Sequence, residues 1–356
     1  MKIGILTFHD TSNFGAMLQT YGLYKCLLQM GHNPEIINYR CEAIIKRETP
    51  PSWSFTLNPK EILKQLLIYP NDRKRYNGIS AFKNNYIGNI SSSVTKATIK
   101  NIANSYDVLM VGSDMVWALN ITDEDYTYFL DFANSCETKC TYGSSIGAPW
   151  TEKQIEKIEK LLSSFKYVSV REDITANIIK GVTKRDVDVV CDPTMLLDTD
   201  TWCELSSDRY RNKEYILVYF NDSEGNCLRK AVEHGKKTGL PVYLLNGYIP
   251  KVNSKNINVY TIHDFLSAIR YASFVYTASY HGLLFSLYFQ KQFLYFEREP
   301  AVRMQYISNR LKIGNRNGEL IGANIEESID YSLLNERIID FREYSKSQIR
   351  KAIENG

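Results

Sequence analysis

A histidine and an arginine in this chain each stand where an apolar run gives way to a predicted helix. His281 comes just after the run 274–277, and residues 282–289 have the pattern of a buried helix. Arg171 ends the shorter run 167–170 and is followed by another predicted helix. A histidine can transfer protons near neutral pH, and an arginine binds anions through paired N–H groups. These two residues are our candidates for catalysis.

Smaller polar residues also follow predicted strands. Because the carboxyl ends of parallel strands meet at one edge of a sheet, ligands bind there, beside helix N-termini. The candidates for donor or substrate binding are Asn13, Gly15, Gly112, Ser113, Asp114, Ser145, Ser279 and Gly282. The alternative for each is a purely structural role. His281 would then pack the turn, Asn13 would form a turn, and Asp114 would hold backbone N–H groups.

Length and composition narrow the class of protein. The chain has 356 residues, 44% of them hydrophobic, which suits two globular domains. The net charge of +3 is small and does not indicate nucleic-acid binding. The seven cysteines suit neither a disulfide scaffold nor a zinc site, so we expect no metal. No signal peptide or membrane span is seen, which predicts a cytoplasmic protein.

The chain reads as two successive series of strands and helices. We expect an α/β protein with two Rossmann-like domains, residues 1–200 and 201–356, divided between residues 192 and 213. A last helix at about 326–352 is a candidate to pack back on the first domain. Within residues 41–93, we expect helices at 59–68 and 73–86, and the role of this region stays open. The predicted strands are 2–8, 34–39, 107–111, 139–145, 167–170 and 187–191, then 215–220, 241–245, 259–262, 274–277 and 292–296.

Two such domains are expected to face each other across a cleft. Opposed domains would place Arg171 and His281 on facing walls. An arginine for an anion, a histidine for proton transfer and several Gly/Ser turns predict an anion-handling transferase.

The motifs together resemble the polysaccharide pyruvyl transferase family over nearly the whole chain. They are Asn13-Phe14-Gly15-Ala16 with Leu18-Gln19, Val111-Gly112-Ser113-Asp114 through Trp117, Tyr142–Gly147, Val170-Arg171-Glu172-Asp173, Asp192-Pro193-Thr194, Ser279-Tyr280-His281-Gly282 with Phe285-Ser286, and Asn309-Arg310. The resemblance implies a GT-B-like fold, like that of the glycosyltransferases with two Rossmann-like domains. It also implies a phosphoenolpyruvate donor, no cofactor, and a sugar acceptor that receives a pyruvate ketal. Such products occur in capsules and exopolysaccharides. A lipid-linked oligosaccharide acceptor would bring the chain into peripheral contact with the inner membrane.

The resemblance also implies roles for individual residues. It gives phosphate binding to Arg171 and catalysis to His281. Some members have an arginine where this chain has Ser279, so another cation is needed, and we expect Arg310, with Arg303 behind it. Met115 stands where glutamine is frequent, which removes a polar contact.

Two alternatives stay open. One is a glycosyltransferase of the same architecture that uses a nucleotide-sugar donor and has Glu297 or Glu299 near the ribose. The other is a non-catalytic glycan-binding relative, a reading that Ser279 supports and that His281 and Arg171 oppose.

Overall fold

The chain forms two compact units. Unit 1 contains Met1–Thr49, Ser80–Leu197 and Ile338–Gly356, and unit 2 contains Pro50–Ile79 and Asp198–Arg337. Residues 50–79 therefore group with the second half of the sequence, and the end of the chain groups with the first half. The computed structural model describes residues 1–52, 54–55, 58–133, 138–220, 225–246, 253–298, 302–320 and 327–354.

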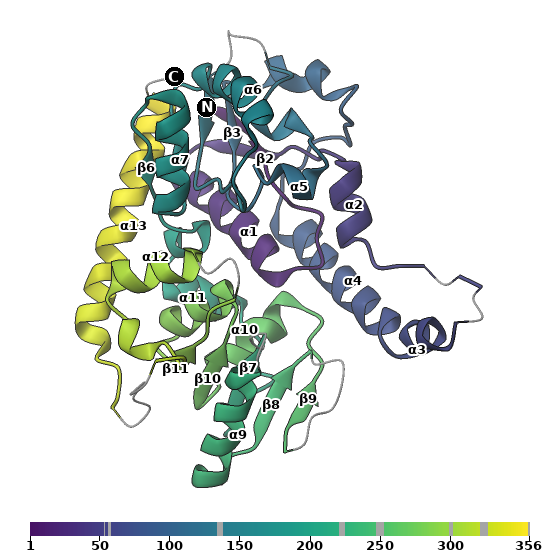
Figure 1. Cartoon of the computed structure of the whole chain (residues 1–356), viewed down its shortest axis with the longest axis vertical. Coiled ribbons are helices and arrows are strands. Elements are labelled where there is room, and N and C mark those ends of the chain that lie inside the picture. Colours follow the sequence, from purple (N-terminus) through teal and green to yellow (C-terminus); the bar gives the residue numbers. More distant parts are fainter. Residues whose placement is uncertain are drawn as a thin grey trace. The chain divides into compact units, whose positions relative to one another are not determined.

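Unit 1 is built on a parallel sheet with the strand order β2-β1-β3-β4 (Figure 1). β5 and β6 form a short parallel pair beside β4. Single β-bridges join Cys140 to Tyr167 and Ser144 to Val170. The parallel pairing brings the carboxyl ends of the strands to one edge. The bounds are β1 (Lys2–Leu6), β2 (Asn33–Ile36), β3 (Val108–Val111), β4 (Thr138–Thr141), β5 (Ser169–Val170) and β6 (Asp188–Val189).

Helices of unit 1 follow these strands after short loops. α1 begins at Phe14 because the Asn13 side chain caps it, and the helix is buried on several sides. α6 begins with a capping box formed by Thr151 and Gln154. The other bounds are α1 (Phe14–Gln29), α2 (Glu42–Glu48), α5 (Leu119–Thr122), α6 (Glu152–Ser163), α7 (Asp173–Thr183), and the 3₁₀ segments Ile99–Ser105, Tyr126–Phe129 and Pro193–Leu196.

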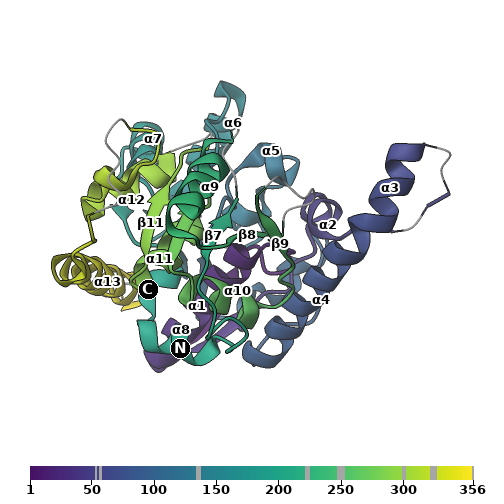
Figure 2. The same ribbon diagram turned by 90° about the horizontal axis from the view of Figure 1, so that it is seen from below.

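Unit 2 has a parallel sheet of its own, with the strand order β11-β10-β7-β8-β9. Helix α9 covers one face, and α10 and α11 lie on the other (Figures 1 and 2). Alternate residues point to opposite faces of a strand, so Ile216, Val218, Phe274 and Tyr276 pack with α9. The strands are β7 (Ile216–Tyr219), β8 (Val242–Leu245), β9 (Lys255–Ile257), β10 (Phe274–Thr277) and β11 (Gln292–Tyr295).

The helices of unit 2 complete the α/β pattern. α4 and α13 each contain residues of both units. The bounds are α3 (Pro59–Leu67), α4 (Tyr69–Tyr86), α8 (Thr199–Leu205), α9 (Asn226–Thr238), α10 (Ile262–Arg270), α11 (Tyr280–Tyr288), α12 (Val302–Leu311), α13 (Tyr331–Glu354) and the 3₁₀ segment Gly314–Arg316.

One predicted strand is wrong. Residues 259–262 were expected to pair in the sheet, but the strand is β9, a few residues earlier. The Asn246 side chain explains this, because its Oδ1 accepts from the Val259 N–H at 2.8 Å and its Nδ2 donates to the Val259 carbonyl at 3.1 Å. These bonds occupy the backbone groups that a ladder would use. Thr261 then caps α10.

Candidate active site

The turn after β3 places a carboxylate at the carboxyl edge of the unit 1 sheet. Asp114 has a φ of 82°, in the left-handed region that residues other than glycine seldom adopt. Its Oδ1 accepts a hydrogen bond from the N–H of Met115 at 2.8 Å, and its backbone bridges to Ser144 beyond the end of β4. Backbone strain of this kind is found preferentially at functional sites.

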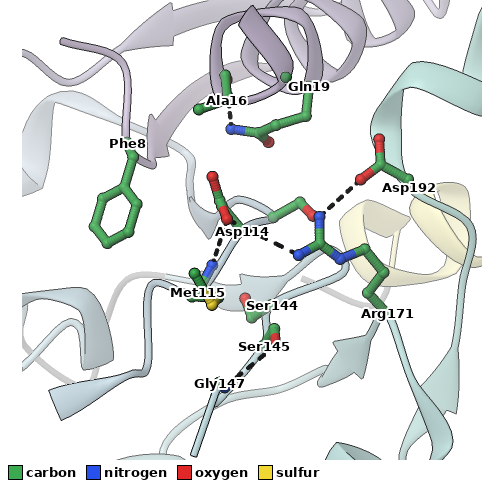
Figure 3. A network of polar contacts seen from close by, with 12 residues as sticks. Phe8, Ala16, Gln19, Asp114, Met115, Ser144, Ser145, Gly147, Arg171 and Asp192 are labelled. Carbon is green, nitrogen blue, oxygen red and sulfur yellow. Dashed lines mark hydrogen bonds and ion pairs between the residues drawn. The ribbon is translucent and has the colours of Figure 1, made fainter. Parts of the chain in front are cut away.

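Arg171 follows β5 at the same edge, and its side chain is completely buried. Its Nη1 donates to Oδ2 of Asp192 at 2.7 Å. Its Nη2 lies 3.9 Å from Oδ1 of Asp114, and its Nε lies 3.9 Å from Oε2 of Glu172. Figure 3 shows the guanidinium between Asp114 and Asp192. Arg171 thus joins the carboxylates of turns that follow different strands.

The two buried carboxylates of this network, Asp192 and Glu172, also accept hydrogen bonds from other residues. Oδ1 of Asp192 accepts from the N–H of Thr194 at 3.0 Å and from its hydroxyl at 2.7 Å. Oε1 of Glu172 accepts from the hydroxyl of Thr175 at 2.7 Å and from the hydroxyl of Ser145. The Ser145 hydroxyl is therefore a partner of Glu172.

The charges in this network do not leave Arg171 as an open anion site. One guanidinium faces the carboxyl groups of Asp114, Glu172 and Asp192, so an added anion would be repelled unless a carboxylate moved or took up a proton. Asp114 is the most exposed of the three, with 14% of its side chain accessible. Carboxylates fixed in this way can accept hydrogen bonds from neutral hydroxyl groups.

Asn13 and Gly15 lie at the start of α1. Oδ1 of Asn13 accepts from the N–H of Gly15 at 2.8 Å and from that of Ala16 at 3.4 Å. Gly15 does not have a positive φ. The structural alternative for Asn13 was a turn, and the structure gives the side chain a related role as the cap of α1. The residue is exposed, and its amide nitrogen is a donor that the cap does not use.

Gly112 and Ser113 complete the edge. A Cβ on Gly112 would lie 2.9 Å from Cβ of Thr7, so no larger residue fits there. The Ser113 hydroxyl and Oε1 of Gln19 are buried and have no hydrogen-bond partner among the described residues. Figure 3 shows Gln19 near Asp114 and Arg171. Unsatisfied buried polar atoms next to a strained turn suggest a place for a ligand or water.

In unit 2, the predicted histidine lies in the first turn of α11. Ser279 caps the helix, its hydroxyl accepting from the N–H of Gly282 at 3.2 Å. His281 is buried with 9% of its surface exposed, and its ring centroid lies 5.4 Å from that of Tyr280. The helix begins at Tyr280, so His281 stands where N–H groups and the positive end of the helix dipole are available to an anion.

Gly282 allows α11 to approach the strand ends closely. A Cβ at this position would lie 2.3 Å from Oγ1 of Thr277 and 2.9 Å from Cδ1 of Tyr219. Thr277 is itself fixed, because its hydroxyl donates to the carbonyl of Tyr219 at 2.7 Å. The start of α11 therefore rests directly on β7 and β10.

Of the two arginines of α12 that the sequence singled out, Arg303 has a contact at this helix start. Arg303, in the first turn of α12, lies with its guanidinium carbon 5.6 Å from the centroid of the Tyr280 ring. Arg310 is exposed and lies seven residues further along α12, about 10 Å along the helix axis. Arg303 is therefore the arginine of α12 with a contact next to His281. The role of Arg310 stays a prediction.

Arg75 of α4 is the residue that sequence reasoning missed. Burial raises the pKa of the Tyr219 hydroxyl, and the charge of Arg75 and a hydrogen bond with Ser279 act in the opposite direction. Nη2 of Arg75 donates to Asp72 at 2.9 Å, and its Nε is buried without a hydrogen-bond partner among the described residues. Only a small basic cluster at 72–75 marked it in the sequence.

The structure thus gathers Asp114, Arg171 and Ser145 in unit 1, and Ser279, His281 and Gly282 in unit 2. That Arg171 and His281 share one site stays a prediction, because they belong to different units. In the described parts of the chain, no group of three or more His, Cys, Asp or Glu side chains is arranged for a metal ion. No helix in those parts is long and apolar enough to cross a membrane.

The fold places the chain among GT-B-like proteins, which have two Rossmann-like domains. An α-glucosyltransferase in complex with UDP matches with a TM-score of 0.51 at 8% identity, covering 100% of this chain and 96% of that chain. The UDP-GlcNAc 2-epimerase from Methanocaldococcus jannaschii has a TM-score of 0.48 at 12% identity, covering 96% and 92%. Such low identities describe the fold alone, and the glucosyltransferase match confirms the predicted fold class.

The sequence shows to which family the chain belongs. The family model described as polysaccharide pyruvyl transferase matches residues 13–300. The chain therefore belongs to the polysaccharide pyruvyl transferase family, a family of transferases, as its motifs predict. No curated protein matches it in sequence.

Proposed function

We propose that this protein transfers pyruvate from phosphoenolpyruvate to a sugar of a polysaccharide or glycan precursor and forms a pyruvate ketal. The family supports the reaction class. The observation that carries the proposal is the start of α11, where a titratable histidine, a capped helix N-terminus and nearby arginines occur together. These groups match a donor that has a carboxylate, a phosphate and a carbon to be protonated.

Donor binding in unit 2 is assigned to the helix start and its cations. The N–H groups at the beginning of α11 face the anion, with Arg75 and Arg303 supplying positive charge. Ser279 contributes through its cap, which orients the first turn. The buried Nε of Arg75 is a hydrogen-bond donor that an anion would satisfy. Arg310 remains the sequence-based candidate for the second cation.

His281 is assigned the proton transfers. It gives a proton to the methylene carbon of phosphoenolpyruvate, and C2 becomes electrophilic. One sugar hydroxyl attacks C2 and loses its proton. That proton returns to His281, and the C–O bond to phosphate breaks. A second hydroxyl then attacks C2 and gives its proton to the departing phosphate, so that one phosphate leaves and one cyclic ketal forms. A group that alternates between acid and base near neutral pH serves these steps.

Unit 1 is assigned to substrate binding. The resemblance gives Arg171 a role in holding the donor, and its surroundings add a condition. Since Asp114 lies 3.9 Å from Nη2, this carboxylate has to move before Arg171 can meet an anion. Until then Arg171 orients Asp114, and Asp114 can accept hydrogen bonds from the hydroxyls of an acceptor sugar.

The nucleotide-sugar alternative has less support from the described side chains. Oε1 of Glu297 accepts from Asn317 at 3.1 Å and Oε2 accepts from Gln305 at 2.8 Å, so both oxygens already have protein partners. Glu299 lies outside the described residues. The presence of His281 and Arg171 argues against the other alternative, a non-catalytic glycan-binding protein.

A donor comparison tests the proposal. Thermal unfolding of the full chain is followed with phosphoenolpyruvate, with UDP-glucose and with inorganic phosphate. A ligand present at one hundred times its Kd stabilises the folded chain by about 2.7 kcal/mol. We expect phosphoenolpyruvate to raise the unfolding temperature and UDP-glucose to leave it unchanged. The reverse result would favour the glycosyltransferase.

A further inference from the structure

Helix α3 exposes its apolar side and buries a polar one. Gln65 is 3% exposed, and its amide bonds to the backbone of Ser54 with distances of 3.1 and 3.0 Å. In contrast, the exposed fractions are 41% for Ile62, 57% for Leu63, 56% for Leu66 and 60% for Leu67. A surface helix normally turns such a stripe towards the core. The arrangement in α3 is the reverse.

These apolar residues form one continuous surface. At about 100° per residue, the four side chains fall within a stripe about 140° wide. Phe55, just before the helix, is 94% exposed. In both views, the start of α4 is the described element of unit 2 that lies next to α3 (Figures 1 and 2). An exposed apolar surface of this kind marks an interaction site.

The border of this surface is positively charged. Lys60 and Lys64 are exposed at the edge of the stripe, and Arg73 and Lys74 are exposed on α4. The one carboxylate of α3, Glu61, lies 3.5 Å from Lys64 and accepts a hydrogen bond from Tyr69. Basic residues beside an apolar helical stripe are typical of helices that lie on anionic membranes.

A hollow between Pro51 and the start of α4 adds to this positive charge. It encloses about 310 Å³, with two exposed cations in its wall. An anionic lipid headgroup would fit such a hollow in both size and charge. The lining residues are Pro51, Tyr69, Pro70, Arg73, Lys74 and Asn77.

We propose that α3 docks this protein on an anionic lipid bilayer, with Leu63, Leu66 and Leu67 entering the interface and the surrounding cations meeting the headgroups. A second copy of the chain is a poorer occupant, because its α3 carries the same positive border and the two would repel. The docking is independent of the donor, and it holds the protein where a lipid-linked acceptor would lie.

Vesicle flotation of the full chain tests this. The vesicles contain either phosphatidylcholine alone or equal parts of phosphatidylcholine and phosphatidylglycerol. We expect binding to the anionic vesicles, weakened by added salt. Leu63→Glu with Leu66→Glu should lower the vesicle affinity by roughly a hundredfold, since each buried leucine contributes about tenfold or more. Lys60→Gln with Lys64→Gln should weaken binding to the anionic vesicles.

Leu333→Glu is the matched control, because Leu333 is 50% exposed on α13, away from this stripe, and the variant should bind vesicles like wild type. Thermal unfolding of each variant shows whether it is folded. Wild-type protein that stays off anionic vesicles, or a folded Leu63/Leu66 variant that binds them unchanged, would overturn the proposal. So would a wild-type dimer that becomes monomeric in the Leu63/Leu66 variant, because the surface would then join two copies.

Discussion

Nη1 of Arg171 lies 2.7 Å from Oδ2 of Asp192, and neither side chain is accessible to solvent. A buried ion pair of this kind is costly to break from one side, because the remaining charge stays in a medium of low dielectric. The pair fixes the guanidinium at the carboxyl edge of the sheet. The position of Arg171 thus depends on a residue that follows a different strand.

Asp192→Ala should therefore destabilise the protein by about 3–5 kcal/mol. The variant leaves Arg171 without its shortest partner and removes the acceptor for Thr194. Chemical denaturation measures the effect. Asp186→Ala is the control, since the Asp186 side chain is 98% exposed in a surface pair with Lys180, and such pairs contribute about 0–1 kcal/mol. Equal stability of the two variants would show that the pair is unimportant.

Arg75→Ala should weaken phosphoenolpyruvate binding by about ten- to a hundredfold, because charge-assisted hydrogen bonds contribute about 1.5–3 kcal/mol. Arg75→Lys should restore part of the affinity, since lysine keeps the charge but lacks the planar fork. Isothermal titration measures both. Arg73→Ala, an exposed cation on the same helix, is the control. If Arg75→Ala and Arg73→Ala bind the donor equally well, Arg75 has no part in the site.

Gly282→Ala should unfold or strongly destabilise the protein, because the new methyl group would lie 2.3 Å from Oγ1 of Thr277. Gly181→Ala tests the same change in α7, where a Cβ meets nothing within 4 Å. There the alanine should stabilise by roughly 0.5–1 kcal/mol through its higher helix propensity. Thermal unfolding compares the two. A Gly282→Ala protein as stable as wild type would contradict the close approach of α11 to the strands.

The parts of the fold and the site that could be predicted from the sequence depend on residues close together in the chain. The strand β10, the turn and α11 are adjacent in sequence, so His281, Ser279 and Gly282 were placed together from their order alone. Strand 259–262 failed because the side chain of Asn246 takes the backbone groups of Val259, a tertiary contact that periodicity does not report.

Other parts of the site depend on contacts between distant segments. Two of the carboxylates beside Arg171, those of Asp114 and Asp192, are distant in sequence and are brought there by the sheet. Arg75 and Tyr219 are far apart in the chain. Burial of Arg171 also had no sequence signal, because arginines are usually exposed.

His9 should make folding stability fall below neutral pH. Burial lowers its pKa from the ordinary value of 6.5, so below that pH the unfolded chain binds a proton that the folded chain does not. Stability therefore decreases as the pH drops from 7 towards 5, by up to about 1.4 kcal/mol per pH unit for this proton. Denaturation at several pH values measures the slope. His9→Gln should make it shallower, and an unchanged slope would rule out His9 as its source.

The central claim is that phosphoenolpyruvate is the donor and that His281 moves the proton. It is tested most directly by turnover with a panel of sugar and lipid-linked glycan acceptors, following phosphate release together with ketal formation by mass spectrometry. Wild-type protein should release phosphate and form the ketal, and His281→Gln should be about 10²–10⁴-fold slower while remaining folded. Release of UDP from a nucleotide sugar without consumption of phosphoenolpyruvate, or wild-type turnover by His281→Gln, would contradict the account.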